Sequence, residues 1–138
     1  MARKTETLTQ VEFFSAKPEE VYDALIDQKK HSAFTGAKAT CDPRVGGKFT
    51  AWEGYIFGKN LILEKGKMIV QEWKTTDWPR GYSPSTVEFS FKEKERGKGS
   101  GTELTMVHSR VPSEQAEDYR QGWIDYYWKP LKEYFLRR

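Results

Sequence analysis

Apolar and polar residues alternate with a period of two from Leu8 to Phe14, which predicts a β-strand with one half-apolar face. The spacing then changes to that of a helix. Pro18 has the backbone angle favoured at the first helical position, and Val21, Ala24 and Leu25 recur along one side. The N-terminal region is therefore predicted to be a strand followed by an amphipathic helix.

A second short helix is predicted directly after the first. The Asp27 carboxylate can accept hydrogen bonds from the first free amides of a helix that runs through Phe34. Gly36 follows, and glycine readily adopts the left-handed conformation that ends a helix. Two short helices should therefore separate the first strand from the rest of the chain.

From residue 46 onward the pattern becomes a series of strands with short turns. The predicted strands are residues 48–52, 55–63, 67–76, 85–92 and 102–110. The predicted connections are Glu53-Gly54, Lys65-Gly66, Trp78–Gly81 and the charged segment Glu93–Gly101. Connections this short join antiparallel neighbours, because a parallel crossover needs a dozen or more residues. The pattern predicts an antiparallel meander.

The C-terminal region is predicted to form one long helix. Ser113 is a candidate cap after Pro112, and aromatic and aliphatic residues from Ala116 to Phe135 follow the three-and-four spacing of one broad face. About 22 helical residues span about 33 Å, enough to cross a whole sheet. Pro130 lacks the amide that would bond to Tyr126, so a bend is expected there.

This order of elements fits one α+β architecture. A sheet of six or seven antiparallel strands twists strongly, and a single long aromatic-faced helix can lie in its concave side. The expected structure is a helix-grip fold. Residues 1–138 should form one domain, with a core spanning about residues 8–135.

Charge and composition narrow the functional classes. The 23 basic and 20 acidic residues give a net charge of +3 and are interspersed, unlike the basic stripe of a nucleic-acid-binding protein. No apolar run is long enough to span a membrane, and the first residues lack the apolar stretch of a signal peptide. Cys41 is the single cysteine, and no metal-ligand cluster is present. We expect a cytoplasmic monomer without a cofactor.

No catalytic constellation stands out, so we expect a protein that is not an enzyme. His31 lies in a polar stretch and is interpreted as a surface residue. His108 shares a strand face with Leu104 and Met106, and a hydrogen-bonded core histidine is favoured over a catalytic one. Gly46-Gly47-Lys48 lacks the spacing of a phosphate-binding loop.

Two alternatives are open for the concave face. Its side chains either fill the space at the density of a protein core, or leave a pocket that holds a small hydrophobic ligand. The residues concerned are Gln71, Trp73, Val87, Phe89, Phe91, Met106, His108, Trp123, Tyr126 and Tyr127.

A second candidate site is a protein-binding surface. Its residues would be Trp52, Trp78, Arg80 and Trp128, which lie near turns or off the apolar helix face. Exposed aromatic residues beside basic ones are good interface anchors. The alternative is that Trp78 packs over the sheet edge.

Several motifs together resemble one family. These are Gly46-Gly47-Lys48-Phe49, Trp78-Pro79-Arg80-Gly81, and Arg120-Gln121-Gly122-Trp123 followed by Tyr126-Tyr127. In this order, and across roughly residues 8 to 135, the chain resembles the C-terminal domain of the activator of heat-shock protein 90 ATPase. The resemblance implies a START-like, pollen-allergen-like helix-grip fold.

The resemblance also implies a binding module without chemistry of its own, whose partner is a heat-shock protein 90-type chaperone. In the eukaryotic co-chaperone, a separate N-terminal domain makes the main contact, and the C-terminal domain helps hold the nucleotide domains closed. Three hypotheses follow. The chain is a co-chaperone-like module, a carrier of a small hydrophobic ligand, or an enzyme that uses the pocket, with His108 as its acid or base.

Overall fold

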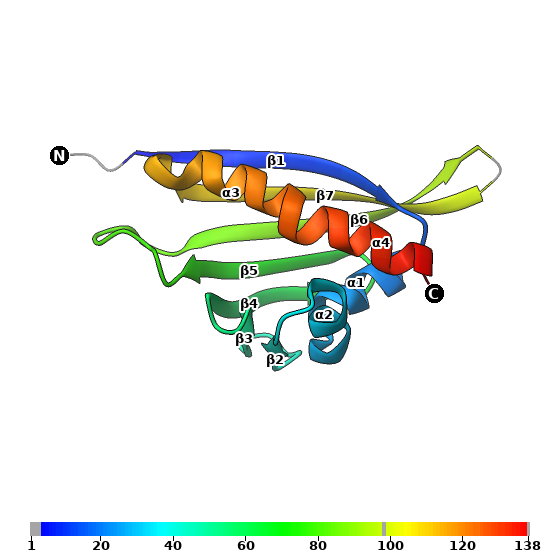
Figure 1. Ribbon diagram of the computed structural model, residues 1–138, viewed down its shortest axis with the longest axis horizontal. Helices are drawn as coiled ribbons and strands as arrows, with labels where there is room; N and C mark the ends of the chain where they lie inside the picture. The colour runs from blue at the N-terminus through cyan, green and yellow to red at the C-terminus, as the bar shows by residue number, and fades with distance from the viewer. Residues whose placement is uncertain (1–3, 98, 138) are drawn as a thin grey trace.

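The computed structural model describes residues 4–97 and 99–137, which form a curved antiparallel sheet with a long helix across one face (Figure 1). The seven strands lie in the order β1-β7-β6-β5-β4-β3-β2. Their bounds are β1 Thr5–Phe14, β2 Thr40–Cys41, β3 Lys48–Ala51, β4 Ile56–Glu64, β5 Met68–Thr75, β6 Ser85–Arg96 and β7 Gly99–Pro112. Every neighbouring pair is antiparallel. The short connections predicted this for the meander from β3 to β7.

The helices form two groups. The short helices α1 (Pro18–Ile26) and α2 (Gln28–Thr35) connect the two edge strands β1 and β2. The C-terminal helix consists of a 3₁₀ turn (Ser113–Gln115), α3 (Ala116–Trp123), a π-helical turn (Ile124–Trp128) and α4 (Lys129–Arg137). Figure 1 shows α3 and α4 as one continuous helix, with α1 and α2 beside its C-terminal part. The predicted helix-grip fold is confirmed.

The local signals for α2 act as predicted. The Asp27 carboxylate accepts hydrogen bonds from the amides of Lys29 and Lys30, at 2.9 and 3.0 Å. Gly36 ends the helix with a φ of 78°, in the left-handed region. Both signals depend on contacts within one helical turn, so they can be identified from sequence alone.

The ends of several strands differ from the prediction. The two-residue strand β2 was not predicted, because two residues carry no periodic signal. The charged segment Glu93–Gly101 was expected to be a connection, but β6 and β7 pair through it as far as Arg96 and Gly99. Lys94 and Glu103 form a 2.7 Å ion pair across this hairpin. The charged residues Glu93–Arg96 of β6 are all exposed, so their side chains stay in water while the backbone ladder continues.

The long helix begins and bends differently from the prediction. Ser113 lies inside the 3₁₀ turn, and no side chain caps either that turn or α3, so its predicted role as a cap is wrong. Before Pro130 the helix widens into the π-helical turn, in which the Lys129 amide bonds to the Ile124 carbonyl. A proline in a regular α-helix clashes with the carbonyl four residues earlier, and a wider turn relieves that clash.

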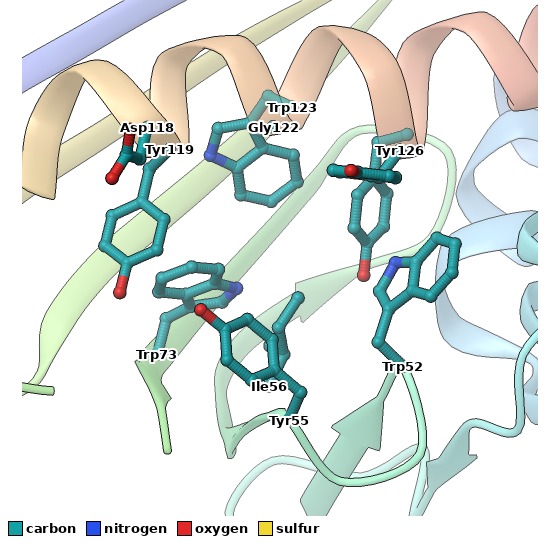
Figure 2. A pocket seen from close by; sticks show the side chains of 10 residues that line it. Trp52, Tyr55, Ile56, Trp73, Asp118, Tyr119, Gly122, Trp123 and Tyr126 are labelled. Carbon is teal, nitrogen blue, oxygen red and sulfur yellow. The ribbon is translucent and has the colours of Figure 1, made fainter. Parts of the chain in front are cut away.

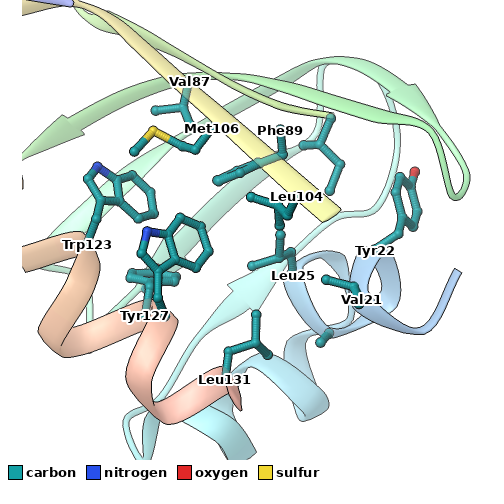
Figure 3. Close-up of a cluster of buried hydrophobic side chains, with 14 of the residues drawn as sticks. Val21, Tyr22, Leu25, Val87, Phe89, Leu104, Met106, Trp123, Tyr127 and Leu131 are labelled. Carbon is teal, nitrogen blue, oxygen red and sulfur yellow. The ribbon is translucent and has the colours of Figure 1, made fainter. Parts of the chain in front are cut away.

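The core lies between the long helix, α1 and the central strands (Figure 3). Val21 and Leu25 of α1 face Phe89 and Leu104 of β6 and β7, and all four are buried. The long helix closes the cluster with Trp123, Tyr127 and Leu131. On this part of the concave face, the side chains fill the space between sheet and helix.

Candidate functional site

A pocket of about 480 Å³ lies between the long helix and the part of the sheet formed by β3, β4 and β5 (Figure 2). Its lining comes from the β3–β4 turn, the start of β4, the end of β5, α3 and the π-helical turn. The lining residues are Trp52, Tyr55, Ile56, Trp73, Asp118, Tyr119, Gly122, Trp123, Tyr126 and Tyr127. Ligand sites of small molecules are typically about 300–1,000 Å³ in volume.

Two backbone features leave this space open. Three consecutive residues of the β3–β4 turn, Trp52, Glu53 and Gly54, have left-handed φ angles of 51°, 57° and 91°. Such a turn is costly for side-chain-bearing residues, and it places Trp52 against the helix. On the opposite wall Gly122 has no side chain, and an added Cβ would meet only Tyr126 Cδ2, at 3.9 Å.

Hydrogen bonds hold two of the pocket tyrosines. The Tyr119 hydroxyl donates to Gln115 Oε1 at 2.8 Å, so it accepts from Thr75 Oγ1 at 2.7 Å. The Tyr55 hydroxyl donates to Asp77 Oδ2 at 2.8 Å. Burial raises the pKa of both phenols. Tyr55 and Tyr119 are therefore neutral and fixed in orientation at neutral pH.

His108 lies behind the pocket in a fully buried hydrogen-bond chain. Trp123 Nε1 donates to His108 Nδ1 at 3.0 Å; because an indole only donates, the imidazole proton must be on Nε2. Nε2 then donates to Ser85 Oγ at 2.8 Å, and Ser85 donates to the Trp73 carbonyl at 2.9 Å. Burial lowers the pKa of His108 to about 3. His108 is the predicted core histidine, and it positions two tryptophans of the pocket wall.

His31 was expected at the surface, and that interpretation is wrong. Its side chain is buried, with Nδ1 donating to the Leu25 carbonyl at 3.1 Å and Nε2 accepting from the Tyr127 hydroxyl at 3.0 Å. It also stacks on Phe34. Burial lowers the pKa of this imidazole. The sequence does contain a signal for this burial. His31 lies three residues before the apolar Phe34, a spacing that places both on one face of a helix.

The ten residues predicted to line a cavity separate into two groups. Trp73, Trp123, Tyr126 and Tyr127 line the pocket. The other six are buried in the core and do not line it: Gln71, Val87, Phe89, Phe91, Met106 and His108. Five of them lie on β6 and β7, under the helix and α1, where side chains from both sides meet. Gln71 lies on β5, where it is buried and donates to Asn60 Oδ1 at 2.9 Å. The sequence left a filled core and a pocket as alternatives for the concave face. The structure contains both, on different parts of that face.

The predicted protein-binding residues also separate. Trp128 was expected off the apolar face, but it is 1% exposed, stacks on Trp123 and donates to Gln10 Oε1 at 2.6 Å. The prediction that it is exposed is wrong, because the π-helical turn directs two successive residues, Tyr127 and Trp128, inward.

The other three members of that group are at least partly accessible. Trp52 lines the pocket edge-to-face with Tyr126, with ring centroids 5.5 Å apart. Trp78 is half-buried and packs on Trp73 of the central strand β5 and on Tyr119 of α3, not over an edge strand. Arg80 is exposed in the β5–β6 connection. A role in binding a partner stays a prediction for these residues.

Sequence reasoning missed Tyr55, Ile56, Asp118 and Tyr119 as lining residues. Tyr119 precedes Trp123 by one helical turn, which was a usable signal. Tyr55 and Ile56 follow a turn whose direction only the fold determines.

One polar atom of the pocket wall has no partner. Among the described residues, Trp52 Nε1 is the buried side-chain nitrogen or oxygen atom without a hydrogen bond.

Two kinds of feature are absent from the described part of the chain. Within residues 4–97 and 99–137, no three histidine, cysteine, aspartate or glutamate side chains are grouped so that they could hold a metal ion. None of the helices in these ranges has the length and apolar character needed to cross a membrane.

Comparison with known proteins assigns the family. The family model described as "Activator of Hsp90 ATPase homolog 1-like protein" matches residues 15–136. The human "Activator of 90 kDa heat shock protein ATPase homolog 1" is 35% identical over 128 residues, which are 93% of this chain and 36% of that protein. A Dictyostelium discoideum homolog of this activator is 33% identical over 86% of this chain and 30% of its own length. The chain thus spans about a third of the length of these curated relatives.

Solved structures agree with this assignment. An HSP90 activator from Plasmodium falciparum has a TM-score of 0.77 and 26% identity, covering 88% of this chain and 89% of that one. The Aha1 dimer from Colwellia psychrerythraea has a TM-score of 0.78 at 16% identity, covering 94% and 96%, and this likeness concerns the fold alone. The chain therefore belongs to the family of Activator of Hsp90 ATPase homolog 1-like proteins.

Proposed function

We propose that this domain is a monomeric, cytoplasmic binding module that contacts an HSP90-type chaperone and raises its ATPase rate. The observation that carries the proposal is the family match across residues 15–136, together with 35% identity to a human protein named as an activator of this ATPase. The matched region is about a third of that relative, so the proposal carries the activity named for the whole relative over to one part of it.

The state of the reactive side chains supports a role in binding rather than in catalysis. Both ring nitrogens of His31 and of His108 are engaged within the protein, and neither histidine lines the pocket. Burial raises the pKa of the Cys41 thiol, which disfavours the reactive thiolate. The hypothesis of an enzyme that uses His108 therefore has the least support of the three.

A titration of the domain into a full-length HSP90-type chaperone tests the proposal. We expect a saturable rise in the rate of ATP hydrolysis that a specific inhibitor of the chaperone abolishes. The exposed Arg80 is the predicted surface residue whose charge can be reversed without disturbing the core. Arg80→Glu should lower the activation.

Lys67→Glu is the matched control, because Lys67 is also exposed and lies before β5 while Arg80 follows it. This variant should activate like the wild-type domain. An unchanged ATPase rate at saturating excess of the wild-type domain would contradict the proposal. Equal activation by both variants would remove Arg80 from the contact surface.

The pocket supports a second candidate function, the binding of a small hydrophobic ligand. Seven of its ten lining residues are aromatic, and its volume of about 480 Å³ suits a small molecule. This function does not exclude the first, because the pocket occupies only one end of the helix–sheet interface.

A further inference from the structure

Among the residues that line the pocket, the only charge at neutral pH is negative. Asp118 is the one lining residue with a charged side chain at neutral pH, and no lysine, arginine or histidine lines the pocket. Asp118 lies at the α3 end, beside Tyr119 (Figure 2). The chain as a whole has a net charge of +3, so the pocket differs in sign from the molecule around it.

A second carboxylate lies behind the pocket wall. Asp77 Oδ2 accepts the hydroxyl proton of Tyr55 at 2.8 Å, and Tyr55 lines the pocket. This carboxylate adds to the negative potential without being a lining group itself. An anionic ligand would therefore meet the exposed carboxylate of Asp118 in the lining, the field of Asp77 behind Tyr55, and no basic side chain of the lining.

The aromatic walls favour the same sign of ligand. Figure 2 shows Trp73, Tyr119 and Trp123 on one side of the space and Trp52 and Tyr126 on the other. On the first side the Trp73 ring centroid is 5.2 Å from that of Tyr119 and 5.8 Å from that of Trp123. The faces of aromatic rings are electron-rich, and those of tryptophan attract organic cations most strongly.

We infer that the pocket binds a small organic ammonium ion, with its charge among the aromatic faces and near Asp118, and its apolar part against Ile56 and the remaining rings. The inference builds on the second candidate function, since it names the chemical class of the pocket ligand. A neutral hydrophobic molecule would fill the same volume but would gain nothing from the carboxylates.

The test compares phenyltrimethylammonium with tert-butylbenzene, which has the same shape without the charge. The readout is the indole N–H signals in two-dimensional NMR spectra, because Trp52, Trp73 and Trp123 line the pocket while Trp78 and Trp128 do not. We expect the ammonium ion to shift the pocket signals and to bind about tenfold more tightly than tert-butylbenzene.

A pair of neighbouring variants isolates the charge. Asp118→Asn keeps the side-chain shape and should weaken binding of phenyltrimethylammonium by about threefold to tenfold, with no effect on tert-butylbenzene. Glu117→Gln is the control, because Glu117 is an exposed neighbour that pairs with Arg120 at 3.2 Å and does not line the pocket. It should leave both affinities unchanged.

The outcomes separate the inference from the function on which it rests. Equal or tighter binding of tert-butylbenzene, together with unchanged affinities in Asp118→Asn, would overturn the ammonium assignment but keep a hydrophobic pocket. If neither probe shifts the indole signals of Trp52, Trp73 or Trp123, both the ammonium site and the ligand-carrier function are wrong. The chaperone ATPase titration is independent of either result.

Discussion

The long helix meets the sheet in two different ways. Over β6 and β7, Trp123 and Trp128 pack on Phe89, with ring centroids 5.8 and 6.3 Å from it. Toward β3, β4 and β5, Tyr119 and Tyr126 of the same helix border a cavity of about 480 Å³. Both regions are rich in aromatic residues. Aromatic content alone therefore does not determine whether the helix–sheet interface is closed or open. The outcome depends on whether side chains of the sheet fill the space opposite the helix.

His108 connects the closed and the open region. Its hydrogen bond fixes Trp123, which belongs to both, and the chain continues through Ser85 to the backbone of Trp73. A buried network that is fully satisfied makes one arrangement much more stable than its alternatives. The open region thus has a rigid rear wall and a front wall formed by the strained β3–β4 turn.

Truncation of a tryptophan in the closed region should have the largest effect on stability. Trp128→Ala removes a side chain that is 1% exposed, together with its hydrogen bond to Gln10, so we expect a loss of about 3–5 kcal/mol. Tyr126→Ala in the open region is the control, and because Tyr126 is 58% exposed it should cost about 1 kcal/mol or less. Urea unfolding measures both, and equal losses would refute the division into two regions.

Lowering the pH should have the second-largest effect on the stability of the protein. The folded-state pKa of His108 is about 3, below its ordinary value of 6.5, so the unfolded chain binds the additional proton between these values. The stability that the neutral imidazole provides is present above pH 6.5 and is lost as the pH falls toward 3. At pH 5 the loss from His108 alone should be about 2 kcal/mol relative to pH 7.5.

The contribution of His108 can be separated from that of His31. The lowered pKa of His31 acts in the same direction, so the wild-type loss at pH 5 should exceed that of His108 alone. In His108→Gln, which can still accept from Trp123 and donate to Ser85, the loss between pH 7.5 and pH 5 should shrink by about 2 kcal/mol. An unchanged pH dependence in this variant would show that His108 is not buried in its neutral form.

Substitutions that add side-chain atoms should change the stability with opposite sign in the two regions, and the change at Gly122 should be the smallest of all. Gly122→Ala in the open region should stabilise the protein by about 0.5–1 kcal/mol, since alanine favours the helix and the new Cβ meets only Tyr126 Cδ2 at 3.9 Å. Ala24→Val in the fully buried part of α1 should destabilise it by about 1–3 kcal/mol through overpacking. Thermal unfolding of both variants checks the signs, and a destabilised Gly122→Ala would mean that the pocket is narrower than described.

Apart from the two-residue β2 and the outer part of the β6–β7 hairpin, the sequence by itself determined the elements and their order, and it also determined the family. The Asp27 cap, the Gly36 helix end and the period-two strands depend on residues within one turn or one strand of each other. Such local signals remain readable without the fold. The short connections then left antiparallel pairing as the arrangement available to the strands.

Only the tertiary structure decided which aromatic residues are buried and where space remains. Helical periodicity placed Trp128 outside, but the π-helical turn before Pro130 shifts the phase and turns it inward. His31 is buried against Tyr127, which is distant in sequence and provides one of its two hydrogen bonds. The pocket exists because the β3–β4 turn and Gly122 of α3 face each other across the space between sheet and helix. A sequence pattern specifies which face a residue occupies, whereas the filling of the space opposite that face depends on contacts between distant segments.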